Sequence, residues 1–310
     1  MRVACIGEAM VELSLEGPAA DRARLGYAGD VLNTAVYLKR AAPELQVDFV
    51  TRLGRDGFSD RMRAFIAGEG VGTGAIETDP DRRPGLYAIE TDAEGERSFT
   101  YWRDSSAARA MFQTGDGPDF SALEDYDVVY LSGITLAILP KPVRSAFCAW
   151  LERRQRDDGG IAFDSNYRPA LWPDQETARG AAGRMWKACT IGLPSLDDEM
   201  ALFGDADEAA AVDRLARYGF TGALKRGARG PVSLGAPDPD DPAYLQMPVA
   251  PAPEDFPPAR QVVDTTAAGD SFNGGYLGAL LTGKSQDEAL RAGHAMASRV
   301  VGAKGAIIPR

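Results

Sequence analysis

The sequence lacks the residues that several classes of enzyme need. Its 310 residues include one histidine, His294, and three widely separated cysteines, Cys5, Cys148 and Cys189. A single histidine leaves little material for a serine hydrolase or a histidine-rich metal site, and the cysteines fit neither a zinc site nor a disulfide framework. We therefore expect a cytoplasmic protein in a reducing compartment, with His294 used for packing or hydrogen bonding.

The chain also lacks long apolar runs and an excess of positive charge. Its longest apolar runs are too short to span a bilayer, and residues 1–8 have no signal-peptide layout. The formal net charge of −11 argues against nucleic acid as a partner. Because the overall field repels anions, an anionic substrate must be met by locally placed cations. We expect small molecules as partners, and neither nucleic acid nor a membrane.

The order of the remaining patterns predicts an α/β fold. Apolar runs typical of strands lie at 2–7, 47–53, 126–133, 160–163, 190–194 and 221–224. Helical spacing of apolar residues is found at 26–40, 59–68, 142–156, 195–203 and 287–302. Because the two patterns alternate and no repeat or linker divides the chain, we predict a single domain over 1–310. Its core would be a doubly wound, mostly parallel sheet flanked by helices. Segment 237–258, rich in proline and aspartate, predicts an irregular surface loop.

Two segments predict a second, smaller sheet. Residues 9–15 alternate apolar and polar side chains, as a half-buried strand does. Residues 84–103 contain two alternating runs around an acidic turn with a glycine at 91–96, which indicates a β-hairpin. We expect these parts, about 9–16 and 84–103, to form a lid beside the main fold.

One face of this lid carries side chains that suit a sugar acid. Tyr101 and Arg103 are two apart in a strand and therefore point to the same side, and we expect Tyr87 to join them. A guanidinium can fork onto a carboxylate, while tyrosine rings cover the carbon chain. The alternative is an exposed strand face with ordinary aromatic residues.

The most informative stretch is 263–276, V-D-T-T-A-A-G-D-S-F-N-G-G-Y. An apolar run ends at Val262 and Val263, and apolar residues at helical spacing begin at Phe272. Between them lie three small residues, Ala267, Ala268 and Gly269, followed by Asp270. We expect a strand-to-helix junction here, where backbone amides and the helix dipole hold a phosphate. Asp270 would then accept the proton of an attacking hydroxyl, although alone it can equally be a first-turn acid.

The segment D-T-T-A-A-G-D-S-F at 264–272 resembles the C-terminal signature of the ribokinase-like (PfkB) sugar kinases, D-T-x-G-A-G-D-x-F. Ala267 replaces the first glycine of that signature. The resemblance implies that Asp270 is the catalytic base. It also implies that the amides of Ala268, Gly269 and Asp270 form an anion hole.

The resemblance extends along the whole chain. Y-W-R at 101–103 and N-Y-R-P-A-L-W at 166–172, taken together with the signature, are similar to the branch that phosphorylates 2-keto-3-deoxygluconate. Residues implied to contact the sugar acid are Gly29, Asp30, Asn33, Tyr87, Tyr101, Arg103, Arg168 and Asp270. Arg103 and Arg168 are the candidates for its carboxylate, and Arg168 can instead reach the phosphates.

The resemblance also implies a nucleotide site. The basic turn K-R-G-A-R-G at 225–230 would hold ATP, although a lone G-x-x-G is a weak signal. Residues implied to bind the nucleotide are Asn166, Ser195, Lys225, Arg226, Gly227, Gly230, Ala267, Ala268 and Gly269. Mg²⁺ would bridge the phosphates near Ser195 and Asp198, where many relatives have N-x-x-E. A monovalent cation such as K⁺ would lie near Asp264 and Thr266.

The implied reaction transfers the γ-phosphoryl group of ATP to the terminal hydroxyl, giving 2-keto-3-deoxy-6-phosphogluconate. A fructokinase or another ribokinase-like sugar kinase is the close alternative, and two arginines facing the sugar argue against a neutral substrate. A non-catalytic sugar-acid sensor is the alternative of another class, which would not need Asp270. A dinucleotide oxidoreductase is disfavoured because no G-x-G-x-x-G follows the first strand. The resemblance further implies a homo-oligomer paired through the lids.

Overall fold

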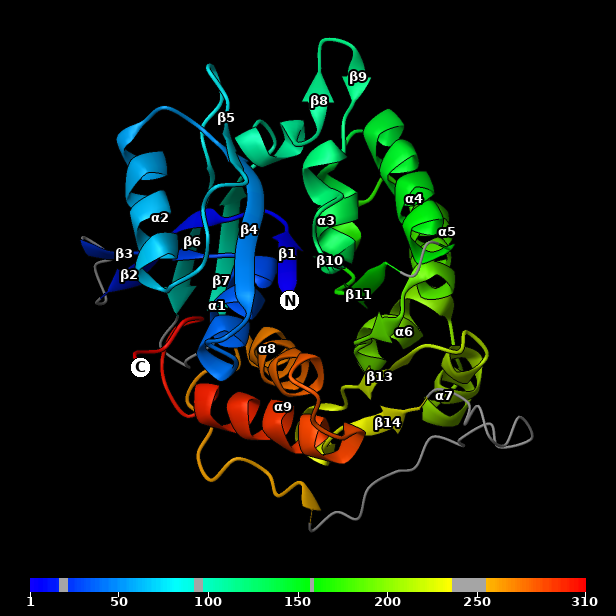
Figure 1. The fold of residues 1–310 in the computed structure, drawn as a ribbon. Coiled ribbons are helices and arrows are strands. Elements are labelled where there is room, and N and C mark those ends of the chain that lie inside the picture. The colour runs from blue at the N-terminus through cyan, green and yellow to red at the C-terminus, as the bar shows by residue number, and fades with distance from the viewer. Residues whose placement is uncertain (17–21, 92–96, 157–158, 236–254) are drawn as a thin grey trace.

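A computed structural model describes residues 1–16, 22–91, 97–156, 159–235 and 255–310. Its centre is an eight-stranded sheet in the order β14-β13-β12-β11-β10-β1-β4-β5 (Figure 1). The strands are β1 (Arg2–Ile6), β4 (Gln46–Leu53), β5 (Ile76–Thr78), β10 (Val128–Ser132), β11 (Gly160–Asp164), β12 (Ile191–Gly192), β13 (Thr221–Leu224) and β14 (Val232–Leu234). Neighbours pair in parallel except β13 and β14, which confirms the predicted doubly wound, mostly parallel sheet.

Helices cover both faces of this sheet because its strands are apolar on both sides. In β1, Val3 and Cys5 belong to the core on one face, and Ala4 and Ile6 to the core on the other. The first face packs against α1 (Asp30–Ala41), α2 (Gly57–Gly68), α8 (Ala268–Leu281) and α9 (Gln286–Val300). The second packs against α3 (Gly133–Ile138), α4 (Lys141–Arg156), α5 (Gln175–Ala188), α6 (Leu196–Phe203) and α7 (Glu208–Ala216). Among the described residues, no helix combines the length and apolarity that crossing a bilayer requires.

Minor elements lie between these. They are the two-stranded pair β8 (Gln113–Thr114) and β9 (Gly117–Pro118), and the 3₁₀ turns η1 (Ala107–Ala110), η2 (Ser121–Leu123), η3 (Pro169–Leu171) and η4 (Gly227–Arg229).

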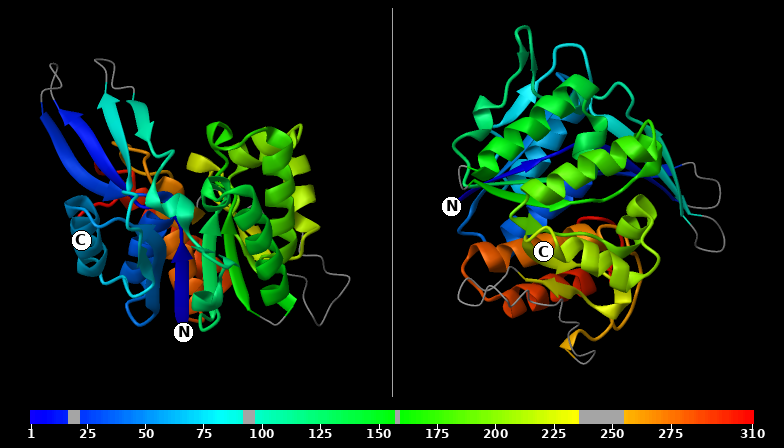
Figure 2. Two further views of the ribbon diagram at one scale, coloured as in Figure 1. Left: turned by 90° about the horizontal axis from the view of Figure 1, so that it is seen from above. Right: turned by 90° about the vertical axis from the view of Figure 1, so that its right-hand side faces the viewer.

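The predicted small sheet is present, and it projects from the body of the molecule (Figure 2, left). Its order is β3-β2-β6-β7, with β2 (Met10–Glu16), β3 (Arg22–Ala28), β6 (Gly85–Thr91) and β7 (Arg97–Trp102). Strand β3 was not expected, although R-A-R-L-G-Y at 22–27 alternates arginine and glycine with alanine, leucine and tyrosine. Most of the predicted turn at 91–96 and of the predicted loop at 237–258 lies outside the described residues.

The strand predicted before α8 is wrong. In the described segment 255–267 there is no strand, and the side chains of Val262 and Val263 are 62% and 42% exposed. The amides of Val263 and Asp264 both donate to the carbonyl of Val301, just after α9. Two successive amides that share one acceptor cannot form a strand ladder, so the run is a loop fastened to the end of α9.

Helices α1 and α8 pack unusually closely. A Cβ atom added at Gly274 would lie 2.6 Å from Cβ of Tyr37, and one added at Gly278 would lie 2.8 Å from Cβ of Ala41. Only glycine leaves room at such contacts, and the two helix N-termini are thereby brought together.

Candidate active site

The predicted site residues converge at one edge of the large sheet, where its parallel strands end. Asp164 ends β11 and Lys225 follows β13, while Asp30 opens α1 and Asp270 lies in the first turn of α8. Strand β1 has β10 on one side and β4 on the other, so the order of the sheet reverses beside it. Ligands of open α/β sheets bind at such a reversal, outside the carboxyl ends of the strands.

Asp270 is held between α1 and α8. Its carboxylate accepts a hydrogen bond from Asn33 Nδ2 at 2.8 Å, and its backbone carbonyl accepts one from Thr34 Oγ1 at 3.1 Å. Part of its surface remains open, but the surrounding chain withdraws the carboxylate from bulk water. This burial, together with the charges of Asp30 and Asp164, raises the pKa of Asp270 to about 8, against the Asn33 hydrogen bond and Lys225. A base with a pKa near neutral is well matched to general base catalysis.

A buried network lies beneath Asp270. Asp164 accepts hydrogen bonds of 2.6 Å from both Lys225 Nζ and Asn273 Nδ2. Lys225 also donates to Asn273 Oδ1 at 3.1 Å, and Asn273 donates to the Tyr130 hydroxyl at 3.0 Å. The sequence analysis did not assign Asn273 or Tyr130 to the site. The spacing of Asn273, three residues after Asp270 in a helix, was a signal that could have found it.

The predicted anion hole is smaller than expected. Ala267 precedes α8 in the left-handed region, with φ 59° and ψ 18°, which turns the chain into the helix. The amide of Ala268 donates to the Thr265 carbonyl at 3.2 Å, so it is already used. The amides of Gly269 and Asp270 lie in the first turn, where no intrahelical acceptor is available. A Cβ added at Gly269 would lie 3.6 Å from Lys225 Nζ, so a cation lies beside these two amides.

Asp30 is linked to the ends of two strands. Its carboxylate accepts hydrogen bonds from Ser132 Oγ and, at 2.8 Å, from Asn166 Nδ2. Asn166 was predicted to bind nucleotide and has a left-handed backbone, with φ 31°, which is uncommon for a residue other than glycine. Ser132 was missed by the sequence analysis. We name Asp30, Asp164 and Asp270 the carboxylate cluster.

The side chains predicted on the lid occupy one face of the small sheet. Tyr87 and Tyr101 are directly opposed in the β6–β7 register, with ring centroids 5.6 Å apart. The Arg103 guanidinium lies 5.9 Å from the Tyr101 ring centroid. Two acids missed by the sequence analysis hold this face, because the Tyr87 hydroxyl donates to Glu12 and Arg103 donates to Glu8. Arg103, expected to meet a ligand carboxylate, therefore already has a carboxylate partner.

Arg168 lies beside Asp198 of α6, the helix that Ser195 precedes. Arg168 is 52% exposed, and its Nη1 lies 2.8 Å from the Tyr167 carbonyl and 3.4 Å from Asp198 Oδ1. Burial raises the pKa of Asp198, while Arg168 opposes that change. Ser195 precedes α6 and pairs as an isolated bridge with Lys225, which places the predicted phosphate side chains together.

In the basic turn at 225–230, two of the charges expected to hold ATP already have partners within the protein. Arg226 and Arg229 both form ion pairs with Glu208 at the start of α7. Because Glu208 engages both guanidinium groups, Lys225 and the backbone around Gly227 and Gly230 are the parts of the turn best suited to a phosphate.

Asp264 and His294 fasten the loop that leads into α8. The Asp264 carboxylate accepts hydrogen bonds from the amides of Thr266 at 2.9 Å and Gly305 at 2.7 Å. His294 Nε2 lies 2.8 Å from the Pro257 carbonyl, and its ring packs edge-on against Phe256. His294 therefore has the packing and hydrogen-bonding role predicted for it, whereas a cation near Asp264 remains a prediction.

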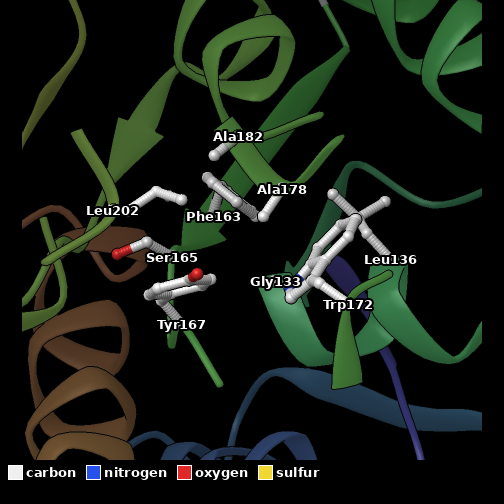
Figure 3. Close-up of a pocket in the computed structure, with 9 residues that line it drawn as sticks. All are labelled: Gly133, Leu136, Phe163, Ser165, Tyr167, Trp172, Ala178, Ala182 and Leu202. Carbon is white, nitrogen blue, oxygen red and sulfur yellow. The ribbon is translucent and has the colours of Figure 1, made fainter. Parts of the chain in front are cut away.

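A small apolar pocket lies beside β11, between Phe163 and Trp172 (Figure 3). It is lined by Gly133, Leu136, Phe163, Ser165, Tyr167, Trp172, Ala178, Ala182 and Leu202. None of these residues was predicted to bind a ligand, and Ser165 and Tyr167 flank the predicted Asn166 in the chain.

Comparisons with known proteins agree with this geometry. Residues 1–310 match the family described as pfkB family carbohydrate kinase. The chain is 42% identical to a 2-dehydro-3-deoxygluconokinase of Dickeya dadantii, over 99% of this chain and 96% of that protein. It is 39% identical to the enzyme of that name from Escherichia coli, over 100% and 97%.

Solved structures are similar over nearly the whole fold. An aminoimidazole riboside kinase from Salmonella enterica, complexed with aminoimidazole riboside and an ATP analogue, has a TM-score of 0.78 at 26% identity, covering 98% of this chain and 94% of that one. A Vibrio cholerae fructokinase with bound fructose, ADP and calcium ion has a TM-score of 0.78 at 23% identity, with the same coverage.

Proposed function

We propose that this chain, which belongs to the pfkB family of carbohydrate kinases, phosphorylates 2-keto-3-deoxygluconate, also called 2-dehydro-3-deoxygluconate. It transfers the γ-phosphoryl group of ATP to the terminal hydroxyl and gives 2-keto-3-deoxy-6-phosphogluconate. The observation that carries the reaction type is the placement of Asp270, a carboxylate with a pKa raised to about 8 at the start of α8. Full-length relatives at 39–42% identity support the choice of substrate.

The proposed mechanism needs a base, groups that bind the phosphoryl group, groups that bind the sugar, and a cover over the site. Asp270 accepts the proton of the attacking hydroxyl and is held in place by Asn33. The amides of Gly269 and Asp270, with Lys225 beside them, stabilise the charge on the transferring phosphoryl group. Asp30 and Asn33 bind sugar hydroxyls, and the small sheet covers the site and excludes water, which would otherwise consume ATP.

The metal requirement is proposed to be Mg²⁺. In the described part of the chain, no group of three or more histidine, cysteine or acidic residues is placed to hold an ion. This fits a magnesium ion that takes most of its ligands from phosphate and water, with Asp198 as the carboxylate within reach. Bound Mg²⁺ would neutralise developing charge on the phosphates. We also propose a K⁺ ion near Asp264 and Thr266, since a double-mutant V. cholerae fructokinase of similar fold has been solved with fructose, ADP and potassium ion bound.

Substrate class separates this proposal from its nearest alternative. A fructokinase of Klebsiella pneumoniae is 30% identical over 89% of this chain, but a neutral sugar offers no carboxylate to Arg103 and Arg168. The test is an ATP-consumption assay of the purified chain across sugar acids and neutral sugars. We expect 2-keto-3-deoxygluconate to give the highest kcat/KM. A higher value for fructose would make the chain a fructokinase, and binding of the acid without ATP consumption would favour a sensor.

We also propose that the chain is a cytoplasmic homo-oligomer that pairs through the small sheet. Leu25 and Trp102, on the face of that sheet opposite Tyr87 and Tyr101, are 41% and 59% exposed, and a second copy would cover them. Light scattering of the purified protein would measure the assembly, and a monomer at micromolar concentration would contradict it.

A further inference from the structure

We propose that Glu8 is a positioning residue for substrate choice, because it fixes the Arg103 guanidinium where the carboxylate of the sugar acid binds. The inference rests on the proposed function. Glu8 follows β1 in the turn toward β2 and was not among the residues that the sequence analysis assigned to the site. Nothing in the catalytic mechanism above uses it.

Glu8 lies where three predicted substrate-contacting parts meet. A Cβ added at Gly29, next to Asp30, would lie 2.1 Å from the Glu8 carbonyl oxygen. A Cβ added at Gly85, which opens the strand of Tyr87, would lie 2.8 Å from Glu8 Oε1. The Glu8 carboxylate itself accepts a hydrogen bond from Arg103 Nη2. Side chains at either glycine would displace Glu8, so the backbone leaves a space that this residue fills.

The ion pair is buried yet incomplete. The side chains of Arg103 and Glu8 are 7% and 1% exposed. Arg103 Nε and Glu8 Oε1 are both buried without a hydrogen-bond partner. Buried polar atoms normally have partners, and here one free donor and one free acceptor lie in the same pair. The hydrogen bond from Arg103 Nη2 is therefore the contact by which Glu8 positions the guanidinium.

An anchored arginine binds a carboxylate better than a free one. An arginine side chain loses considerable rotamer freedom when a ligand fixes it, and a partner within the protein removes that cost in advance. Holding Arg103 through one nitrogen leaves its other N–H donors for a second carboxylate. Glu8 therefore affects substrate choice by placing Arg103, without touching the transferred phosphoryl group.

Two substitutions separate position from charge. Glu8→Asp keeps the buried charge pair but withdraws the carboxylate by one methylene, whereas Glu8→Gln keeps an acceptor in the original place. We expect Glu8→Asp to raise KM for 2-keto-3-deoxygluconate about tenfold, the scale of a weakened charged hydrogen bond, with kcat and the KM for ATP nearly unchanged. Glu8→Gln should stay within about threefold of the wild type. Both variants retain a group that can bond Arg103, so both should fold.

The matched control is Glu69→Asp. Glu69 accepts hydrogen bonds from Arg40 Nε at 3.0 Å and Nη2 at 2.9 Å, in a largely buried pair between α1 and the end of α2. The same shortening there should leave KM for the sugar acid unchanged. In an Arg103→Ala background, Glu8→Asp should have no further effect on kcat/KM, because Glu8 acts through Arg103.

The outcomes distinguish this inference from the proposed function. If the wild type does not phosphorylate sugar acids, the function fails and the inference fails with it. If the wild type does so but Glu8→Asp leaves KM unchanged, only the inference fails. It also fails if Glu8→Gln raises KM as much as Glu8→Asp, or if the effect of Glu8→Asp persists without Arg103.

Discussion

The carboxylate cluster and the inner face of the small sheet differ in how their acidic side chains are paired. In the cluster, Lys225 pairs with Asp164, and burial together with the charges of Asp30 and Asp164 raises the pKa of Asp270 to about 8. On the small sheet, Glu8 is paired with Arg103, and Glu12 with Tyr87. Burial and Glu12 raise the pKa of Tyr87, so its hydroxyl stays protonated and continues to donate.

This difference separates chemistry from recognition. Burial and neighbouring acids produce a base that can take a proton near neutral pH, which a carboxylate paired with a cation would not do. Paired acids hold tyrosine and arginine side chains in fixed positions, which suits binding. Substitution of Asp270 should therefore change the rate and its pH dependence, and substitutions on the sheet should change KM.

The largest expected effect is that of Asp270→Asn. Removing the proton acceptor should lower kcat by at least about 10³-fold, while the binding of the sugar acid persists, because asparagine keeps the size of the side chain. Single-turnover assays and calorimetric titration would measure the two properties. Undiminished turnover would refute the role of Asp270 as the base. Loss of binding along with turnover would show that Asp270 also serves in recognition, so that the two regions do not divide the two tasks.

Arg103→Ala should have the next largest effect, on binding. We expect KM for sugar acids to rise by about two orders of magnitude, the scale of a lost charged hydrogen bond. Activity with neutral sugars, if any is detectable, should change little. Steady-state kinetics with both substrate classes would measure this. An unchanged KM for the acid would favour a neutral sugar as the substrate.

A smaller effect concerns pH. Only ionised Asp270 can accept the proton, so kcat/KM should rise with pH and level off above about 8. The Asn33 hydrogen bond lowers the pKa of Asp270, so Asn33→Ala should move this rise to higher pH. Thr34→Val is the matched control, because Thr34 bonds the backbone carbonyl of Asp270 and not its carboxylate. Equal shifts in both variants would show that the carboxylate contact is not responsible.

The smallest effect is expected at Ala267, which adopts a left-handed backbone with φ 59°. Ala267→Gly should relieve strain and raise the free energy of unfolding by less than about 1 kcal/mol, without changing kcat. Ala279→Gly in the middle of α8 should lower it by about 0.5–1 kcal/mol. Thermal unfolding would rank the three proteins, and a destabilised Ala267→Gly would show that no strain is stored at this turn.

The sequence predicts the large sheet well because its strands are short apolar runs with helices between them, as at 47–53 and 221–224. It predicts the position of Asp270 because small residues followed by apolar residues at helical spacing indicate the start of a helix. It fails at 22–28, which form a strand by pairing with β2, and at 262–263, where an apolar run is a loop held by the end of α9. Glu8, Ser132 and Asn273 were missed because their partners lie far away in the chain and are set by the tertiary fold.

The close packing of α1 against α8 has a consequence for how activity appears during refolding. Asp270 and Asn33 are separated by 237 positions in the chain, and their hydrogen bond requires the two helices to dock through Gly274 and Gly278. Such a long-range contact forms late, after local helices and hairpins. A chain in which α1 and α8 have not docked would therefore lack the Asn33 contact that holds Asp270, so turnover should return only with the last step of refolding.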